Sequence, residues 1–397
     1  MTDSLGQSQV IPYLIGLTKK GHKINILSTE KLEVFNLKND IISKLLEENN
    51  ISWNYIFYTK NPPIFSTLKD VKKLWKKTKN LHKIKSFDII HCRSYISALI
   101  GMKMKRKYST KFIFDMRGFY ADERVDGKIW NLKNPVFNSV YKFFKKKELA
   151  FLKNADSTIS LTHNAKTKIL NWKNIQNLNL DIEVIPCCAD MQRFDPNKTS
   201  KKEIQNLKNE LGISNENFVL TYLGSIGTWY MLDEMLDFYK RLLEKIPLAK
   251  FLFITGENPD FIFSRAKSKK ISLDSFIIKK VDYTEVPLYL SVSNYALFFI
   301  LPVFSKSASS PIKQGEIMSM GIPIVCNSGV GDTDYVINKY NCGILVENFT
   351  NQDYDLAIDK MLNTNFDSSK IRKAANDFYS LEKGIKLYDK TYNEIVK

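Results

Sequence analysis

Short runs of apolar residues alternate along the chain with longer segments in which apolar residues recur every three or four positions. The short runs are rich in Val, Ile, Phe and Tyr and predict β-strands, and the longer segments predict amphipathic helices. Regular alternation of the two is typical of parallel sheets built from β-α-β units, so we expect an α/β fold. The first half contains six predicted strands: His22–Ser28, Trp53–Tyr58, Asp88–Cys92, Lys111–Met116, Ser157–Leu161 and Ile182–Ile185. The second half contains six more: Phe218–Gly224, Lys250–Thr255, Ser275–Lys279, Tyr295–Ile300, Ile322–Cys326 and Gly343–Val346.

A polar segment, Pro196–Asn217, separates the two series of strands and contains a predicted helix over Lys201–Leu211. A chain of 397 residues is long for one hydrophobic core and suits two domains. We therefore expect two Rossmann-like domains, residues 1–192 and 193–375, and a terminal helix over residues 376–397. The whole stretch Ser368–Lys397 has the apolar spacing of a helix with one buried face.

The first ten residues, MTDSLGQSQV, predict a loop containing Gly6 and Gln7 ahead of a helix over Gln9–Lys19. In a sheet of this kind such a loop follows the first strand, and no residue of this sequence forms that strand. The pattern indicates either a start upstream of Met1 or a sheet that lacks one strand, and we favour the upstream start.

Positive charge is concentrated in the first half of the chain. Residues 1–190 hold 33 Lys and Arg against 17 Asp and Glu, whereas residues 191–397 hold 26 against 25. In Lys69–Lys77 and Val140–Lys147 the lysines alternate with bulky apolar residues at helical spacing, as in helices that lie on anionic membranes. Solvated lysines would be spread over both halves, so we expect a membrane surface as a partner. Nucleic acid is not expected, because no recognised binding motif accompanies the basic residues.

The lengths of the apolar runs and the spacing of the cysteines indicate which classes of protein the sequence does not fit. The longest apolar run, Tyr295–Leu301, is far shorter than the ~20 residues that span a bilayer, and no secretory leader pattern is present. The five cysteines have no metal-like spacing, which predicts buried thiols, no disulfide and no bound metal. We expect a cytoplasmic protein, peripheral at the inner face of the cell membrane, with no cofactor.

The segment Ser309–Asp332 (SSPIKQGEIMSMGIPIVCNSGVGD) is the most informative part of the sequence. A turn containing Ser309 and Ser310 is predicted to lead into a short helix that starts near Lys313. The amino end of a helix exposes N–H groups and partial positive charge, which suit it to phosphate. Lys313 adds a cation there, and one turn later Glu316 can accept hydrogen bonds from sugar hydroxyls. The arrangement predicts a nucleotide-sugar site.

A second phosphate-binding candidate follows the strand Phe218–Gly224. The loop GSIGT provides Gly224, Ser225, Gly227 and Thr228, and we expect it to open a helix that runs through Leu232 and Leu236. Its N–H groups would then point toward the ligand. Lys313 is expected to provide a cation for a phosphate at this loop, with Arg117 as a second candidate.

In the first half, polar residues gather where an apolar strand ends, the usual place for site residues in α/β sheets. The segment after Phe112 reads FDMRGFYADER and contains Asp115, Arg117, Asp122 and Glu123. We expect Arg117 to face the diphosphate or the acceptor, and Asp122 or Glu123 to orient the acceptor. The alternative is an Asp–Arg ion pair that only fixes the loop.

His91 and Arg93 end the preceding strand and are further candidates for the acceptor side. A single histidine at such a position is more often structural than catalytic. Gly6 and Gln7 complete the set of acceptor-side candidates.

These motifs resemble retaining glycosyltransferases of the GT-B fold, family four (glycosyl transferases group 1). The segment Ser310–Glu316 is similar to a Ser-Pro-x-Lys-x-x-Glu form found in a minority of them, and Glu316 falls on the glutamate that holds the donor's ribose. The family's earlier glutamate would fall at Ala308, and Asp115, Arg117 and Gly118 stand where many members have a catalytic histidine. The resemblance implies two facing Rossmann-like domains with the active site in the cleft, and a last helix that returns to the N-terminal domain.

The same resemblance implies a metal-independent, retaining hexosyltransferase. It would move a sugar from a UDP- or GDP-sugar to a glycan or lipid-linked acceptor in cell-surface polysaccharide synthesis, with Arg117, Lys313 and Glu316 as its catalytic residues. Two alternatives stay open: a sugar-nucleotide epimerase of the same fold, and a non-catalytic relative that binds a membrane or nucleic acid.

Overall fold

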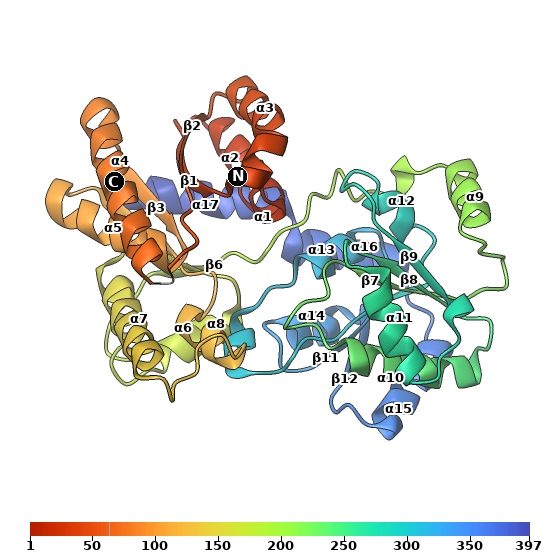
Figure 1. Ribbon diagram of the computed structural model, residues 1–397. Helices are drawn as coiled ribbons and strands as arrows, with labels where there is room; N and C mark the ends of the chain where they lie inside the picture. Colours follow the sequence, from red (N-terminus) through yellow and green to blue (C-terminus); the bar gives the residue numbers. More distant parts are fainter. Residues whose placement is uncertain (63) are drawn as a thin grey trace. The chain divides into compact units, whose positions relative to one another are not determined.

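The computed structural model describes residues 1–62 and 64–397, which form two compact units (Figure 1). Unit 1 consists of Met1–Pro186 together with Leu381–Lys397, and unit 2 consists of Cys187–Ser380. Both are α/β units with parallel strands, as the alternation of elements predicts. The first junction follows Pro186, six residues before the expected boundary at 192.

Unit 1 holds its strands in two separate parallel sheets. One sheet pairs β1 (Asn25–Glu30) with β2 (Ser52–Phe57). The other has the order β3 (Ile89–Arg93), β4 (Lys111–Asp115), β5 (Ser157–Ser160), β6 (Ile182–Val184). Each strand overlaps its predicted run, but the series is interrupted between β1 and β3.

The helices of unit 1 cover these sheets. Gly101 lets α5 approach the sheet closely, because a Cβ there would lie 2.5 Å from the Cys92 sulfur. The helices are α1 (Ser4–Gln9), α2 (Ile11–Thr18), α3 (Leu32–Glu48), α4 (Phe65–Lys85), α5 (Ser94–Tyr108), α6 (Tyr120–Asp126), α7 (Pro135–Asn154), α8 (His163–Leu170) and α17 (Leu381–Val396).

The start of the chain is helical, which corrects the expected loop at Gly6 and Gln7. Both residues lie within α1, because the Asp3 carboxylate caps this helix by accepting a hydrogen bond from the Gly6 N–H at 2.6 Å. The Gln7 side chain donates back to the Thr2 carbonyl oxygen at 2.8 Å. In the structure, therefore, both residues stabilise the first helical turns.

Unit 2 is built on one six-stranded parallel sheet. Its order is β12 (Gly343–Val346), β11 (Ile324–Asn327), β10 (Tyr295–Phe298), β7 (Val219–Leu223), β8 (Lys250–Ile254), β9 (Phe276–Lys279). The continuous apolar sequences of β7, β10 and β11 are fully buried, since helices cover both faces of a parallel sheet. The helices are α9 (Lys201–Glu210), α10 (Leu232–Lys245), α11 (Pro259–Ser268), α12 (Val286–Leu290), α13 (Ile312–Ser319), α14 (Thr333–Tyr340), α15 (Asn351–Asn363) and α16 (Ser368–Tyr379).

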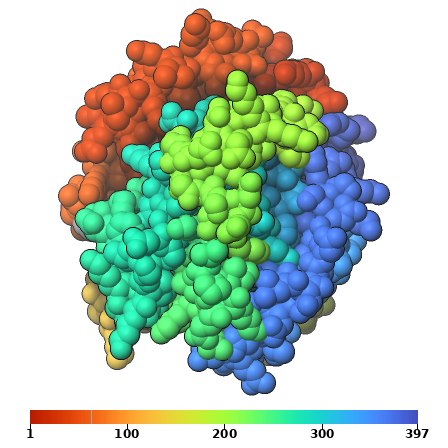
Figure 2. Space-filling model, turned by 90° about the vertical axis from the view of Figure 1, so that its right-hand side faces the viewer, coloured from red at the N-terminus to blue at the C-terminus, as the bar shows by residue number. Residues whose placement is uncertain are grey.

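The helix α9, yellow-green in Figure 2, is a surface element of unit 2. Its start at Ser200 is a reciprocal capping box with Glu203, in agreement with the helix predicted from residue 201. Three short 3₁₀ turns complete the described elements: Pro196–Lys198, Leu273–Ser275 and Phe304–Ala308.

The C-terminal segment forms two helices where one was expected over Ser368–Lys397. Ser380 has extended backbone angles and pairs with Ala189 as an isolated parallel bridge, which ends α16 at Tyr379. The following helix, α17, belongs to unit 1 and packs on α2. The last helix therefore returns to the N-terminal unit, but it begins at Leu381 and not at residue 376.

Candidate active site

The helix α13 carries three polar side chains in an almost fully buried position. Lys313, Gln314 and Glu316 are 7%, 0% and 5% exposed. Polar groups buried in this way require partners or a ligand, because their removal from water is otherwise costly. The helix begins at Ile312, one residue before the expected start near Lys313.

The turn before α13 is anchored by hydrogen bonds within unit 2. The Ser310 hydroxyl accepts a hydrogen bond from the Cys187 N–H at 3.0 Å, and the Ser309 N–H donates to the Lys306 carbonyl oxygen at 3.0 Å. These two hydrogen bonds fix the Ser309-Ser310 turn ahead of the first turn of α13.

Lys313 extends from α13 to the carboxyl end of β7. Its Nζ donates to the Tyr222 hydroxyl at 3.1 Å, and it lies 3.7 Å from the centre of the Tyr230 ring. A Cβ on Gly224 would be only 3.1 Å from this Nζ, so the glycine makes room for the ammonium group. Burial lowers the pKa of Lys313 well below its usual value, although the neighbouring Glu316 acts in the opposite direction. An anion at this place would restore the charged form.

Glu316 lies one turn further along α13 and is held by a phenol. The Tyr283 hydroxyl donates to Oε1 of Glu316 at 2.6 Å, and the Arg193 guanidinium lies 4.7 Å from the centre of the Tyr283 ring. Burial raises the pKa of Glu316 to about 7, although Tyr283, Lys313 and Arg193 each lower it. The carboxyl group can therefore change between hydrogen-bond acceptor and donor near neutral pH.

The loop Gly224–Thr228 does not open a helix directly, which corrects the expectation. The helix α10 begins at Leu232, and Tyr230 pairs with Ile300 as an isolated bridge. The Ile226 N–H donates to the Glu257 carboxylate at 3.2 Å. One N–H group of the loop therefore binds a residue of a neighbouring loop. The loop ends several residues before α10 begins. The Ser225 carbonyl oxygen accepts a hydrogen bond from the Tyr222 hydroxyl at 2.6 Å.

A cavity of about 430 Å³ adjoins this loop. Gly227 and Thr228 line it together with Phe261 and Arg265 of α11, and neither Lys313 nor Glu316 is among its described lining residues. Gly227 and Thr228 are thus separated from the buried polar helix, whereas Gly224 adjoins it.

Several polar residues around α13 are not among those predicted from the sequence. Lys306 is 6% exposed, and its ammonium lies 3.7 Å from the centre of the Trp229 ring. Gln314 accepts a hydrogen bond from Thr333, while its buried Nε2 has no hydrogen-bond partner among the described residues. Tyr222 could not be found from the sequence, because it stands within an apolar strand. Tyr283 follows β9 at the carboxyl end of the sheet, and that position was an available signal.

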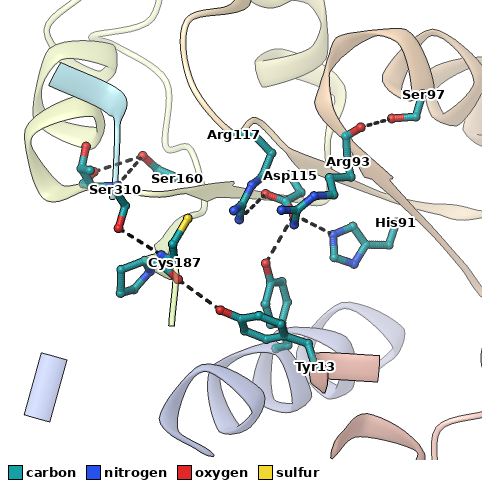
Figure 3. A network of polar contacts seen from close by, with 12 residues as sticks. Tyr13, His91, Arg93, Ser97, Asp115, Arg117, Ser160, Cys187 and Ser310 are labelled. Atoms are coloured by element: carbon teal, nitrogen blue, oxygen red, sulfur yellow. Dashed lines mark hydrogen bonds and ion pairs between the residues drawn. The ribbon is translucent and has the colours of Figure 1, made fainter. Parts of the chain in front are cut away.

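In unit 1 the expected residues at the ends of β3 and β4 converge on one buried carboxylate (Figure 3). Oδ2 of Asp115 lies 3.4 Å from His91 Nε2, 3.5 Å from Arg93 and 3.3 Å from the Tyr388 hydroxyl. Its Oδ1 lies 3.7 Å from Arg117. Burial alone would raise the pKa of Asp115, but Arg117, His91 and Arg93 together hold it below its usual range.

Arg117 has a left-handed backbone, with φ at 57°. For a residue with a side chain this conformation costs roughly 1–2 kcal/mol, and such costs are often found at functional sites. His91 also bonds Tyr392 of α17, with 2.6 Å between Nδ1 and the hydroxyl oxygen. The buried Asp–Arg pair that the sequence left open is present, and the terminal helix contributes two phenols to it.

Asp122 has a different environment from the Asp115 cluster. Its carboxylate accepts from the Tyr141 hydroxyl at 2.9 Å and from Lys145 at 2.8 Å, both on α7. Glu123 follows it in the first turn of α6. Their role toward an acceptor stays a prediction, and the contacts of Asp122 are those of a residue that fixes α6 on α7.

The described residues contain neither a metal-binding cluster nor a membrane-spanning helix. No group of three or more His, Cys, Asp or Glu side chains is placed to hold a metal ion. No helix combines the length and the apolar character needed to cross a membrane.

Two family models together match most of the chain. The model for glycosyl transferases group 1 matches residues 203–378, and the model for glycosyltransferase family 4 matches residues 13–193. The chain belongs to the family 4 glycosyltransferases. The expected family is thereby confirmed, and the two matches fall largely in the two units.

This family 4 chain is similar to a curated enzyme, alpha-monoglucosyldiacylglycerol synthase of Acholeplasma laidlawii. The two are 23% identical over 259 residues, which is 62% of this chain and 60% of the relative's length. The chain thus matches less than two thirds of that relative.

Solved structures confirm the GT-B fold, with its two Rossmann-like domains. A glycosyltransferase of Rickettsia africae has a TM-score of 0.70 and 17% identity, and the match covers 99% of this chain and 97% of that one. The Anabaena protein HepE, solved with UDP and glucose, has a TM-score of 0.65 and 13% identity, with coverage of 94% and 100%.

Proposed function

We propose that this family 4 glycosyltransferase transfers a hexose from a nucleotide-diphosphate sugar to a lipid-linked or glycan acceptor at an anionic membrane surface. The observation that carries the proposal is the pair Lys313 and Glu316, buried one turn apart on α13, with the lysine reaching Gly224 at the end of β7. A buried cation and a buried carboxyl so close together suit a diphosphate and a ribose.

The side chains and the amino end of α13 suit the nucleotide-sugar donor. A diphosphate beside Gly224 would receive the charge of Lys313 and the partial positive charge of the helix terminus. The ribose hydroxyls would replace the Tyr283 hydroxyl on Glu316, which is 2.6 Å away in the structure. The neighbour HepE, solved with UDP and glucose, supports UDP as the first nucleotide to test.

The transfer step needs no metal in this scheme. The bond from the anomeric carbon to the diphosphate oxygen breaks, the acceptor oxygen bonds to that carbon, and the acceptor proton passes to the departing diphosphate. Lys313 stabilises the negative charge that develops on the leaving group. We infer retention of configuration, since the similar enzyme's name denotes an α-linked glucosyl lipid.

Unit 1 has basic residues that could bring the enzyme to a lipid acceptor. On α4 the exposed residues Phe65, Leu68, Lys69, Lys72 and Lys76 recur at helical spacing and share one face. Apolar side chains among lysines suit an anionic lipid surface. The lipid product named for the similar enzyme supports a diacylglycerol-type acceptor, with the chain peripheral at the inner face of the membrane.

Nucleotide binding tests the donor site first. Thermal unfolding with millimolar UDP, GDP, ADP and their glucose conjugates should show stabilisation of several degrees by one nucleotide family. The shift should be lost in Glu316→Gln and in Lys313→Met. No stabilisation by any nucleotide would contradict the donor site and favour a non-catalytic relative.

Turnover tests the reaction itself. The purified protein is incubated with the sugar nucleotide that stabilises it and with vesicles of phosphatidylglycerol and diacylglycerol, and mass spectrometry follows free nucleotide and glycolipid. Glycolipid formation is expected with wild type only. Nucleotide binding without any product would retain the donor site and contradict this acceptor.

Vesicle binding tests the membrane surface. The triple variant Lys69→Glu, Lys72→Glu, Lys76→Glu should lose flotation with phosphatidylglycerol vesicles. The matched control changes Lys198, Lys201 and Lys202, exposed residues of unit 2, to Glu. An equal loss in both would show that net charge alone matters and would contradict a docking face on α4.

A further inference from the structure

The turn between β9 and α12 places a surface tyrosine on the buried carboxyl group of Glu316. Tyr283 is 38% exposed, whereas Glu316 is 5% exposed. The Tyr283 hydroxyl nevertheless reaches Glu316 Oε1 at 2.6 Å. Burial and the neighbouring Glu316 raise the pKa of the Tyr283 phenol, so the hydroxyl is protonated and acts as the donor. The hydrogen bond therefore joins a side chain at the surface to a carboxyl group in the interior.

Two neighbouring residues hold the ring of Tyr283. The Arg193 guanidinium lies 4.7 Å from the ring centre, and the Phe194 ring lies 5.7 Å away in an edge contact. Arg372 on α16 fixes this segment by donating to the carbonyl oxygens of Phe194 at 2.5 Å and Met191 at 3.0 Å. Arg193 itself is exposed, and a cation–π contact of an exposed side chain is weak. The ring is thus held in place but is not locked in a core.

The backbone of the turn is fixed independently of the hydrogen bond to Glu316. The Asp282 N–H donates to the Glu285 carboxylate at 3.0 Å, and the Glu285 N–H donates to the Asp282 carbonyl oxygen at 2.9 Å. Side chains at the surface change rotamer rapidly, so the Tyr283 side chain can rotate while the turn keeps its shape. The hydroxyl can therefore leave Glu316 at little cost to the rest of the unit.

A ribose bound to Glu316 would use both oxygens of the carboxylate. Ribose carries two adjacent hydroxyls, and an ionised carboxylate accepts hydrogen bonds on each of its two oxygens. One of these oxygens, Oε1, already accepts from Tyr283 in the structure. The phenol and one ribose hydroxyl are the same kind of donor, and they compete for the same acceptor atom.

We propose that Tyr283 is a latch that sets the affinity of the donor site: its hydroxyl occupies the place of one ribose hydroxyl on Glu316, and the nucleotide has to displace it. The proposal rests on the proposed function, because it takes Glu316 as the ribose-binding residue. Nucleotide binding then exchanges one hydrogen bond of the carboxylate for another, so the measured affinity is lower than the bound contacts alone would give. In the empty enzyme the latch keeps a buried carboxyl group satisfied.

The latch makes the ribose hydroxyls the part of the ligand that opens the site. A free diphosphate beside Lys313 has no ribose hydroxyl for Glu316 and leaves the Tyr283 hydroxyl in place. A nucleotide that lacks its ribose hydroxyls does the same. Lys313 and Glu316 lie one turn apart on α13, so a ligand with both a diphosphate and a ribose engages both residues. Tyr283 therefore favours a complete nucleotide over its fragments.

Removing only the hydroxyl tests the latch. Tyr283→Phe keeps the ring beside Arg193, and a ribose hydroxyl then gains a hydrogen bond to Glu316 without displacing one. Isothermal titration calorimetry with UDP, GDP and ADP should show about tenfold tighter binding of the preferred nucleotide than in wild type. The matched control, Tyr335→Phe, removes an exposed phenol hydroxyl that accepts from Lys339 at 2.7 Å, and it should leave the affinity unchanged.

The two ways in which this experiment can fail are distinct. Equal or weaker binding in Tyr283→Phe would overturn the latch and assign Tyr283 a permanent role in positioning Glu316, while the donor site would stand. No binding of any of these nucleotides to either protein would contradict the donor site and the latch together. Binding to Tyr283→Phe but not to wild type would support both.

A ligand without ribose hydroxyls separates the latch from a general effect of the substitution. The 2′,3′-dideoxy form of the preferred nucleotide cannot take the place of the Tyr283 hydroxyl on Glu316. Tyr283→Phe should therefore leave its affinity within about twofold of wild type, whereas the nucleotide with both hydroxyls binds more tightly. An equal gain for the two ligands would overturn the proposal, because the substitution would then have widened the site and not released Glu316.

Discussion

The ammonium of Lys313 on α13 lies 3.1 Å from the Tyr222 hydroxyl on β7 and 3.7 Å from the centre of the Tyr230 ring. Two elements separated by almost ninety residues therefore place a cation beside the loop that follows the first strand of unit 2. The lysine is buried without a carboxylate within ion-pair distance in the described chain. Such a position is costly for stability, and a bound anion would offset the cost.

Replacing this lysine should separate stability from binding. Lys313→Met keeps the length of the side chain and removes a buried amine, so we expect the free energy of unfolding to be unchanged or higher by about 1 kcal/mol. Nucleotide binding, measured by isothermal titration calorimetry, should be lost. A variant that unfolds more easily and still binds nucleotide would assign Lys313 a purely structural role.

The raised pKa of Glu316 predicts a pH-dependent stability. The folded carboxyl has a pKa of about 7 against an ordinary 4.5, so the folded protein binds an extra proton between these values. This contribution is complete below pH 4.5 and is lost as the pH rises through 7. Glu316→Gln does not titrate, so it should be more stable than wild type at pH 8, by ~1–3 kcal/mol, and similar at pH 5. Urea unfolding at the two pH values measures this, and an equal difference at both would contradict it.

A side chain at Gly224 is expected to lower both stability and nucleotide affinity. Its φ of 110° is strained for any other residue, and a Cβ would press on Lys313 at 3.1 Å. Gly224→Ala should lower the free energy of unfolding by roughly 1–3 kcal/mol and weaken nucleotide binding at least tenfold. Gly227→Ala is the matched control, since nothing lies within 4 Å of a Cβ there. Equal effects of both substitutions on nucleotide binding would argue against a special role for Gly224.

Removing the Asp115 charge should destabilise unit 1. Asp115→Asn leaves Arg93 and Arg117 facing each other without a carboxylate, which should cost about 3–5 kcal/mol. The lowered pKa means that this stabilisation is present above the ordinary pKa of 3.8 and is lost as the pH falls toward the folded value. Thermal unfolding between pH 3 and 7 should therefore show a smaller acid dependence in the variant. Glu382→Gln, which removes an exposed ion pair on α17, should change stability by less than ~1 kcal/mol.

The strands were predictable because their signal is local. The twelve strands of the described residues all overlap the predicted runs, and β12 agrees at both ends, since a buried parallel strand needs a continuous apolar sequence. The helix at Gly6 and Gln7 was not predicted, because it depends on a cap by Asp3 that a glycine-containing segment does not suggest. The break at Ser380 was missed for a related reason. Its bridge to Ala189 pairs residues far apart in the chain.

The residues of the candidate site also differ in whether the local sequence indicated them. Lys313 and Glu316 were found from their spacing on one helix turn, and His91, Arg93, Asp115 and Arg117 from their places at strand ends. The phenol of Tyr222 was not found, because a tyrosine within an apolar strand has no local mark that distinguishes a polar contact from core packing. The phenol of Tyr388 was not found, because its contact with Asp115 joins residues far apart in the chain.

The sequence by itself determined the α/β class, the positions of the strands along the chain and the family motifs, because these depend on local periodicity and on residues that are near one another in the chain. Tertiary structure alone decided that the lysine of α13 meets β7, that the last helix joins the first unit, and that β1 and β3 belong to separate sheets. Each of these depends on which distant segments pack together, and that choice is made by the summed burial of many side chains rather than by any one motif.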